Sequence, residues 1–250
     1  MFELIKARLG HGYQAIPDPL KAKINEAFPG LPRILSPDRE IFSNAAEICP
    51  CKAIEGLSID LGKCNFCGEC QRLYPDTFRF EPDFRMASQT REGLIVRWQE
   101  DKLSSSVPVV KPDPALAKLF GRSLALRNVS AGGCNACELE LGACSNVNFD
   151  MGRYGVDVVA SPRHSDALII TGPITENMAI ALKETWEAIP EPKLLILCGA
   201  CAISGGVFAE SSALDRSFLV DHPVSLYIPG CPAHPLSIIH AICSLLGRVK

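Results

Sequence analysis

The chain has 250 residues and a formal net charge of −3 at pH 7, with 47% hydrophobic and 21% charged residues. These values are ordinary for a globular protein of one large or two modest domains, and they give no electrostatic reason to expect nucleic acid or an anionic membrane surface as a partner. No apolar run is long enough to span a bilayer, and the first residues lack the pattern of an export signal. We therefore expect a cytoplasmic protein that binds no nucleic acid and has no membrane span of its own.

The first half of the chain lacks long periodic segments. Residues 1–48 are rich in proline and charged residues, so we expect an extended arm with one short helix at 20–27. Residues 49–106 hold five cysteines among tight turns, followed by a strand-like run at 93–98, and we expect them to form a small domain. Prolines clustered after residue 107 predict a linker over 107–121.

The second half, residues 122–250, alternates short apolar runs with helical patterns. Such runs, with few polar interruptions, are typical of a parallel sheet whose two faces are both covered by helices. The sequence therefore predicts an α/β domain here. The expected strands are 123–129, 156–160, 167–171, 193–197 and 224–228, and the expected helices are 177–189 and 236–246.

Cysteine usage is the unusual feature of the composition. There are 12 cysteines, and in a reducing compartment so many thiols indicate metal binding or catalysis. The alternative is a disulfide framework, which would need an export signal that the sequence does not show. The thiols are Cys49, Cys51, Cys64, Cys67, Cys70, Cys134, Cys137, Cys144, Cys198, Cys201, Cys231 and Cys243.

The first group of cysteines has the spacing of an iron–sulfur motif. Cys64, Cys67 and Cys70 form a C-x2-C-x2-C run, which lets three thiolates from one loop reach three irons of a cubane. In bacterial two-cluster ferredoxins the run continues to a fourth cysteine, which ligates the other cluster. Here Tyr74 stands at that fourth position, and Cys49 begins a C-P-x-x-A-I segment upstream.

Cross-ligation explains why each motif is incomplete. Stepping back from Cys49 by the same spacing reaches Ala45, Phe42 and Arg39, none of which is a cluster ligand. Cys49 therefore completes the set of Cys64, Cys67 and Cys70, and the second cluster site has disappeared. We call these four residues the N-terminal cysteine set.

This region resembles a bacterial two-cluster ferredoxin domain that retains one 4Fe–4S cluster. The preceding arm and the stretch from Phe84 to Val96 are similar to ferredoxin-type subunits of membrane-bound hydrogenases. Cys51 lies outside the pattern and is interpreted as a spare thiol. The alternative is a zinc knuckle, but zinc sites usually use two separated pairs of ligands, and three equally spaced cysteines favour iron–sulfur.

A second group of cysteines follows three of the expected strands. Cys134 and Cys137 come after the strand at 123–129, Cys201 follows 193–197, and Cys231 follows 224–228. In an open parallel sheet the loops at the carboxyl ends of the strands share one crevice, so thiolates far apart in sequence can meet there. Glycines beside these cysteines let the backbone approach a bulky group closely. These four residues are the C-terminal cysteine set.

The surrounding sequence, R-Y-G-V-D-V-V-A-S-P-R-H-S-D at 153–166 and T-G-P-I-T at 171–175, resembles the small subunits of NiFe hydrogenases. It is similar in particular to the membrane-bound, formate-hydrogenlyase-type group and to the B subunit of respiratory NADH:quinone oxidoreductase. The resemblance covers 122–247 and implies a flavodoxin-like fold. It also implies that Cys134, Cys137, Cys201 and Cys231 bind a 4Fe–4S cluster beside the active site of a separate large subunit. Cys134-Asn135-Ala136-Cys137 favours the hydrogenases, because the respiratory relative has two adjacent cysteines there.

Other polar residues near these motifs have two interpretations each. Glu138 and Glu140 are either proton-relay groups or solvated carboxylates, and Arg163 with His164 either bond cluster sulfurs or anchor a loop. His234 is a further potential ligand. Cys144, Cys198 and Cys243 are interpreted as buried, inert thiols.

The sequence contains neither a dinucleotide-binding nor a P-loop fingerprint, and no cysteine set for nickel. The combined prediction is a ferredoxin-like domain before a flavodoxin-like domain, with two 4Fe–4S clusters and no catalytic centre of its own. Such a chain would relay electrons between a ferredoxin-type donor and the NiFe site of a hydrogenase-type large subunit. Its partners would include other iron–sulfur and membrane subunits, through which it would be peripheral to the inner face of the membrane. A complex-I-like oxidoreductase component without nickel and a freestanding electron carrier stay open as alternatives.

Overall fold

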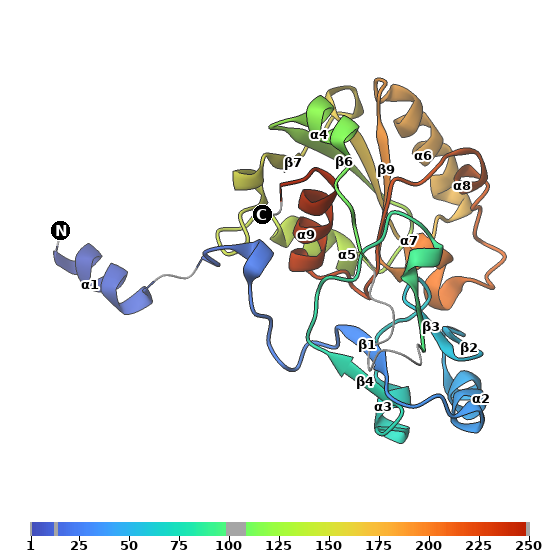
Figure 1. The fold of residues 1–250 in the computed structure, drawn as a ribbon. Coiled ribbons are helices and arrows are strands. Elements are labelled where there is room, and N and C mark those ends of the chain that lie inside the picture. Colours follow the sequence, from blue (N-terminus) through green and yellow to red (C-terminus); the bar gives the residue numbers. More distant parts are fainter. Residues whose placement is uncertain (1, 13–14, 99–108, 249–250) are drawn as a thin grey trace.

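The computed structural model describes residues 2–12, 15–98 and 109–248, and its centre is a five-stranded, fully parallel sheet (Figure 1). The strand order is β10-β9-β8-β6-β7, which in chain order reads 2-1-3-4-5 from the β7 edge. This is the flavodoxin-like order, whose switch point lies between the first and third strands, here β6 and β8. The strands are β6 Leu124–Ser130, β7 Val156–Val158, β8 Ala167–Thr171, β9 Leu194–Cys198 and β10 Leu226–Ile228. The predicted fold class is confirmed.

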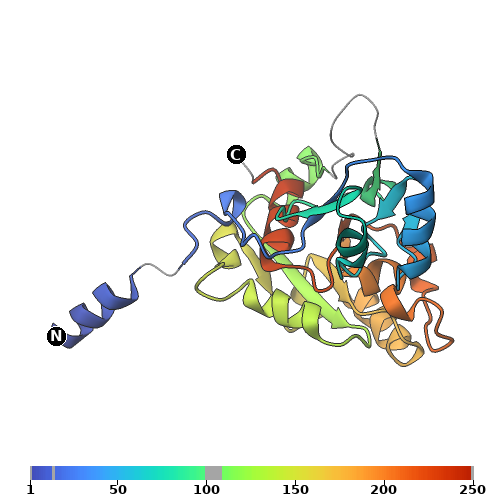
Figure 2. The ribbon, with the colours of Figure 1, turned by 90° about the horizontal axis from the view of Figure 1, so that it is seen from below.

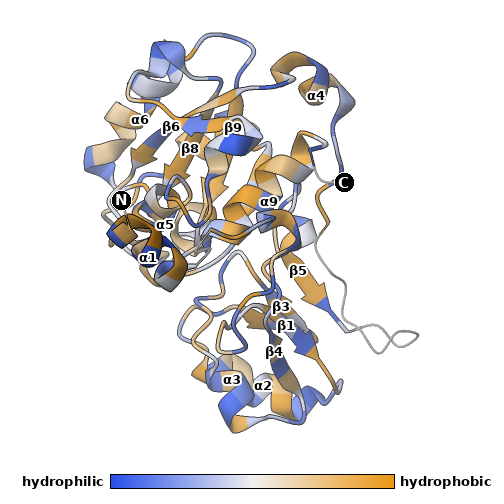
Figure 3. Cartoon of the chain, turned by 90° about the vertical axis from the view of Figure 1, so that its left-hand side faces the viewer, coloured by the Kyte–Doolittle hydropathy of each residue, from blue (hydrophilic) through white to orange (hydrophobic). Residues whose placement is uncertain are grey.

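The two faces of the sheet bury two different sets of side chains. Leu168 and Ile170 of β8 join one hydrophobic cluster, whereas Ala167 and Ile169 join the other, as the two-residue period of a strand requires. All five residues of β8 and of β9 are buried, which explains why these strands read as continuous apolar runs. Figure 3 shows hydrophobic residues concentrated along these central strands and α9.

Helices cover both faces of the sheet (Figure 1). Helices α6, α7 and α8 lie on one side, and α4, α5 and α9 contribute to the hydrophobic cluster on the other. The bounds are α4 Pro114–Phe120, α5 Ala136–Ala143, α6 Glu176–Ala188, α7 Ala200–Ser204, α8 Phe218–Asp221 and α9 Pro235–Leu245. The expected helices at 177–189 and 236–246 correspond to α6 and α9. Helix α4 falls inside the expected linker, of which residues 107–108 lie outside the described residues.

The N-terminal region is built from small antiparallel sheets and two helices. Strands β1 and β4 pair with each other, and β2, β3 and β5 form a three-stranded antiparallel sheet. This arrangement is consistent with the expected ferredoxin-like α+β region. The elements are β1 Leu31–Ile34, α2 Arg39–Ile48, β2 Ile54–Glu55, β3 Ser58–Asp60, α3 Glu69–Leu73, β4 Phe78–Glu81 and β5 Ile95–Arg97.

The arm differs from the expectation in its local structure. The helix expected at 20–27 is reduced to a 3-10 turn, Pro19–Lys21, because only Asp18 caps it and no apolar face follows. Helix α1, Phe2–His11, was not expected, and it extends away from the rest of the molecule (Figure 2). Helix α2 was missed too, although Asp38 caps it through the backbone N–H groups of Glu40 and Ile41. In the described part of the chain, no helix is long and apolar enough to cross a bilayer.

A backbone pair, an ion pair and a close approach are among the contacts that hold the N-terminal region against the C-terminal domain. Ser88 and Tyr227 exchange two backbone hydrogen bonds at the β10 edge of the sheet, 3.0 and 2.8 Å long. Lys52 forms an ion pair with Glu210. Gly62 approaches Ile203 so closely that an added Cβ would lie 2.7 Å from the isoleucine side chain. The hydrophobic cluster on one face of the sheet therefore continues into the N-terminal region.

Candidate redox centre

The N-terminal cysteine set lines a single cavity. Cys49 follows the last turn of α2, Cys64 and Cys67 lie on the loop after β3, and Cys70 lies in the first turn of α3. All four residues line the same cavity, whose other walls are mainly apolar, including Ile54, Ile59 and Phe80. The expected convergence of these four residues is therefore present in the fold.

The local backbone directs N–H groups at two of these sulfurs. The Ala53 N–H donates to Cys49 Sγ and the Phe66 N–H donates to Cys64 Sγ, each over 3.3 Å. Phe66 and Gly68 adopt left-handed conformations, with φ of 57° and 75°, which turn the loop tightly around the cavity. Donors aimed at sulfur stabilise thiolate charge and raise the reduction potential of a bound cluster.

The place of the missing second cluster is filled by hydrophobic side chains. Phe42 and Ala45, which stand at two of the lost ligand positions, are buried on α2. The Phe42 ring meets Phe78 edge-on with centroids 4.9 Å apart. Tyr74, at a third of these four positions, packs against the same hydrophobic cluster, whereas Arg39, at the fourth, is exposed. Phe42 also borders a second hollow together with Arg39 and Ile54, which contains no cysteine.

The C-terminal cysteine set gathers at the carboxyl edge of the parallel sheet. Cys134 and Cys137 lie at the turn from β6 into α5, Cys201 lies in α7 after β9, and Cys231 follows β10. Their thiols are close enough to affect one another's ionisation. Burial raises the pKa of Cys137 to about 12 and that of Cys201 to about 11, and neighbouring cysteines of the set add to both shifts.

Two glycines make room around these sulfurs. A Cβ added to Gly199 would lie 2.5 Å from Cys137 Sγ, and one added to Gly206 would lie 2.9 Å from Cys201 Sγ. Gly199 also has a φ of 91°, so a larger residue there would be strained as well as crowded. Side chains larger than hydrogen at these two glycine positions would therefore fill the space around the sulfurs of the C-terminal set.

The donor chemistry of both sets fits an iron–sulfur cluster. In the described residues, no three Cys, His, Asp or Glu side chains are grouped so that they could hold one metal ion. A tetrahedral ion with Zn–S bonds of about 2.3 Å needs sulfurs only about 4 Å apart. A cubane places each thiolate on a different iron, so its four ligands surround a larger volume. Burial also raises the pKa of Cys64, and that of Cys70 to about 11, so assembly would release protons.

The remaining cysteines are all buried. Cys144, Cys198 and Cys243 are fully buried, as expected for inert thiols. Cys51 is also buried, but it lies between the two sets. Burial raises the pKa of Cys51 to about 11, with smaller contributions from Cys49 and from Cys231. The sequence does not mark Cys51 as part of a site, because its spacing from the other cysteines matches no cluster motif.

Other residues considered from the sequence fall into three situations. Glu138 accepts a hydrogen bond of 2.7 Å from Thr171 Oγ1, whereas burial alone raises the pKa of Glu140. The His234 ring caps α9 by accepting from the Leu236 N–H, which gives it a structural role.

Arg163 and His164 are exposed in the turn that leads into the start of β8. That turn is at the opposite end of the sheet from the cysteines, so the suggested bonds to cluster sulfurs are wrong.

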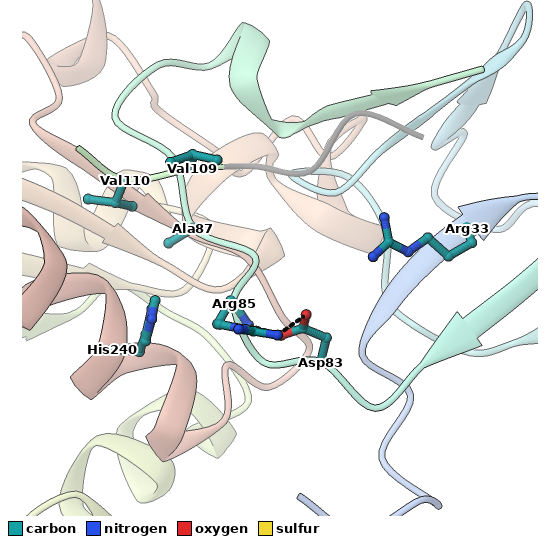
Figure 4. A pocket seen from close by; sticks show the side chains of 7 residues that line it. All are labelled: Arg33, Asp83, Arg85, Ala87, Val109, Val110 and His240. Atoms are coloured by element: carbon teal, nitrogen blue, oxygen red, sulfur yellow. Dashed lines mark hydrogen bonds and ion pairs between the residues drawn. The ribbon is translucent and has the colours of Figure 1, made fainter. Parts of the chain in front are cut away.

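A separate hollow lies between the N-terminal region and α9 (Figure 4). Two of its polar residues form an ion pair, in which Arg85 Nε and Asp83 Oδ1 are 2.9 Å apart. It contains no cysteine and none of the residues predicted to bind a cofactor. Its lining residues are Arg33, Asp83, Arg85, Ala87, Val109, Val110 and His240.

A flavodoxin-like sheet with four cysteines at its carboxyl edge defines a class of electron-transfer α/β proteins. The sequence model of the NADH ubiquinone oxidoreductase 20 Kd subunit family matches residues 134–245. The probable membrane-bound hydrogenase subunit mbhJ of Pyrococcus furiosus is 39% identical over 138 residues, which are 54% of this chain and 80% of the relative.

Two further relatives are equally similar. Formate hydrogenlyase subunit 7 of Escherichia coli is 39% identical over 136 residues, covering 54% of this chain and 53% of the relative. The B subunit of the NADH-quinone oxidoreductase of Clostridium beijerinckii is 39% identical over 118 residues, covering 47% of this chain and 70% of the relative.

The chain belongs to the NADH ubiquinone oxidoreductase 20 Kd subunit family. This family consists of iron–sulfur electron-transfer subunits, so the chain is a subunit of an oxidoreductase complex. The match begins at Cys134, and it therefore leaves the N-terminal cysteine set untested.

Proposed function

We propose that the chain is the electron-transfer small subunit of an energy-converting NiFe hydrogenase complex. In this proposal it relays electrons between a ferredoxin-type donor and the NiFe site of a partner large subunit. Cys49, Cys64, Cys67 and Cys70 hold one 4Fe–4S cluster, and Cys134, Cys137, Cys201 and Cys231 hold the other. Each cluster supplies one-electron redox chemistry and no bond-making step.

The observation that carries the proposal is the convergence of two separate cysteine quartets within one chain. The N-terminal quartet lines one cavity, and the C-terminal quartet meets at the carboxyl edge of the parallel sheet. Only two residues separate Cys49 from Lys52, whose ion pair with Glu210 ties this segment to the loop after Cys201. Cys51 is close enough to Cys49 and Cys67 of one quartet and to Cys231 of the other for each to raise its pKa, and this proximity supports an electron relay between the two sites.

The chain's own residues hold, orient and shield the sulfurs. The N–H groups of Ala53 and Phe66 stabilise thiolate charge in the N-terminal set. Gly199 and Gly206 leave the space that the C-terminal set needs. The apolar walls beside Cys64 exclude water, which keeps the reorganisation energy of electron transfer small. No residue of the chain is required to move a substrate proton.

Two alternatives remain. A complex-I-like oxidoreductase component without nickel is supported by the match to the Clostridium beijerinckii relative, which is as identical as the hydrogenase relatives. The two residues between Cys134 and Cys137 favour the hydrogenase. A freestanding carrier is disfavoured because Cys134 and Cys231 are exposed at the crevice, where a partner surface would cover them.

The test is a metal count on the chain and on its complex, both purified anaerobically. The proposal expects about eight irons per chain, as two cubanes require, with nickel only in the complex. About four irons would remove one of the two cysteine sets from the proposal. Stoichiometric zinc would reject electron transfer at that site, and a complex with eight irons but no nickel would support the complex-I-like alternative. A stable monomer that keeps both clusters during size exclusion would favour the freestanding carrier.

A further inference from the structure

Arg216 binds the turn that carries Cys201. Its guanidinium donates to the carbonyl oxygens of Pro173, 2.9 Å, and Cys201, 3.2 Å. The other terminal nitrogen donates to the carbonyls of Ala202, 2.7 Å, and Ile203, 3.0 Å. Helix α7 has only five residues, and its cap, the Gly205 N–H, donates to the Cys201 carbonyl, so Arg216 is a second donor to Cys201 and also bonds the carbonyls of Ala202 and Ile203 in the last turn. Arg216 therefore joins the loop after β8 to the turn after β9 at the edge where the cysteines meet.

The positive charge of Arg216 has no carboxylate partner among the described ion pairs. All four of its hydrogen bonds go to neutral carbonyls. The neighbouring Arg91 differs, because Asp60 binds its guanidinium with two oxygens, at 2.8 and 2.5 Å. A guanidinium stays charged under all ordinary conditions, even though burial lowers the pKa of Arg216. Arg216 thus contributes an uncompensated, half-buried cation beside Cys201.

We propose that Arg216 is a positioning residue whose charge raises the reduction potential of the C-terminal cluster, an inference that rests on the function proposed above. Reduction adds one negative charge to a cluster, and a nearby cation stabilises that charge. Because the guanidinium is partly buried, solvent screens this interaction less than it screens an exposed lysine. The same hydrogen bonds fix the Cys201 turn, so the residue combines a structural and an electrostatic effect.

Arg248 provides a matched control for the structural effect. It also binds four backbone carbonyls, those of Phe120, Gly121, Tyr154 and Gly155, and it also lacks a carboxylate partner among the described ion pairs. Those carbonyls lie near the start of β6, at the other end of the sheet from the cysteines. Replacing Arg248 removes the same type of bonds without removing charge from the cysteine crevice.

The experiment compares Arg216→Gln, Arg216→Lys and Arg248→Gln in the full chain by anaerobic potentiometric titration, followed by electron paramagnetic resonance. We expect Arg216→Gln to lower one of the two midpoint potentials. The ratio of reduced to oxidised cluster at fixed ambient potential should fall at least fivefold, which is about 40 mV for a one-electron couple. Arg216→Lys keeps the charge and should change the ratio less than twofold. Arg248→Gln should leave both potentials unchanged.

Each result decides the inference. Two intact clusters in Arg216→Gln with unchanged potentials would overturn it, and so would an equal shift in Arg248→Gln. If Arg216→Gln loses the C-terminal cluster, Arg216→Lys decides: an intact cluster at the parent potential supports a role for the charge. Loss of the cluster in both variants overturns that role and leaves only the carbonyl bonds. Failure of the two-cluster proposal is distinguishable, because the parent chain itself would then lack about eight irons.

Discussion

The N-terminal and C-terminal cysteine sets are assembled in different ways. The N-terminal set comes from one continuous segment, residues 49–70, in which a loop and the ends of two short helices surround a cavity. The C-terminal set comes from three loops spread over residues 134–231, which only the order of the parallel strands brings together. The first site depends on local geometry, whereas the second depends on the whole sheet.

The two sets also differ in how well this chain covers them. In the N-terminal set Cys64 is buried and only Cys67 is exposed, but both Cys134 and Cys231 are exposed in the C-terminal set. A cluster at the sheet edge would therefore need another surface to exclude water, and a large subunit would supply it. Under the proposed function, the N-terminal site would be covered by this chain alone, and the C-terminal site would be completed by a partner surface.

The largest expected effect comes from removing one ligand from either set. Cys64→Ala should abolish the N-terminal cluster and Cys201→Ala the C-terminal cluster, and each variant should lose about four of eight irons. The physical reason is that the remaining three thiolates leave one iron without its protein ligand. Iron and sulfide analysis, together with electron paramagnetic resonance of the surviving cluster, measures the loss.

Nearby thiols outside the sets serve as controls for these variants. Cys51→Ala and Cys198→Ala remove buried sulfurs adjacent to the two sites, and both should retain the full iron content. If Cys51→Ala lost four irons and Cys49→Ala did not, our assignment of the N-terminal ligands would be wrong. A similar exchange between Cys198 and Cys201 would show the same for the C-terminal set.

A second effect concerns the hydrophobic core around Phe42 in the N-terminal region. Phe42 is 2% exposed, and Phe42→Ala should lower the free energy of unfolding by about 3–5 kcal/mol, as for other buried aromatic truncations. Phe2→Ala makes the same chemical change at a residue that is 77% exposed and should cost less than about 0.5 kcal/mol. Denaturant unfolding measures both. A small loss for Phe42→Ala would contradict the burial of this ring in a packed core.

The two regions were not equally predictable from the sequence. The five strands of the parallel sheet and helices α6 and α9 were predicted within a few residues. The signal is clearest for β8 and β9, whose residues are all buried and therefore form continuous apolar runs. Helix α2 was missed because its buried residues, Phe42 and Ala45, are few and lie in a segment rich in charge. Helix α1 was missed although it carries the apolar residues Phe2, Ile5 and Leu9, all of which are exposed in this chain.

The cysteine sets were proposed from spacing and from position after strands, and the fold brings each set together. Neither Cys51 nor Arg216 could be identified in that way. The place of Cys51 between the sets depends on how the N-terminal region packs against the loop after Cys201. The bonds of Arg216 join carbonyls from segments that are distant in sequence, and a carbonyl ligand leaves no residue signature.

The C-terminal region also encloses thiols that are fully buried and belong to neither set, and one of them, Cys243, predicts a pH effect. Burial raises the pKa of Cys243 to about 12 from the usual 9.0, although Arg248 opposes the shift. Below pH 9 this thiol is neutral in both the folded and the unfolded chain, and its contribution to stability is complete. As the pH rises from 9 through 12 the unfolded thiol ionises first, so this stability is lost.

Comparison with Cys243→Ala isolates that contribution. Between pH 8 and pH 10 the parent chain should lose about 1.4 kcal/mol more unfolding free energy than the variant. Urea unfolding at both pH values gives the difference, and thiols common to both chains cancel. Equal losses in the two chains would contradict the inference that the Cys243 thiol stays un-ionised inside the fold.

The smallest expected effect tests directly whether this chain shields the two cysteine sets from solvent to different extents. In the isolated chain, a chelator should remove iron from the C-terminal set at least about threefold faster than from the N-terminal set, since Cys134 and Cys231 are exposed. Cys64→Ala and Cys201→Ala, each retaining one cluster, identify which site releases iron in a time course. Adding the large subunit should slow the release from Cys64→Ala and leave that from Cys201→Ala unchanged. Faster loss from the N-terminal set, or equal protection of both by the partner, would remove the distinction between a self-contained site and an interface site.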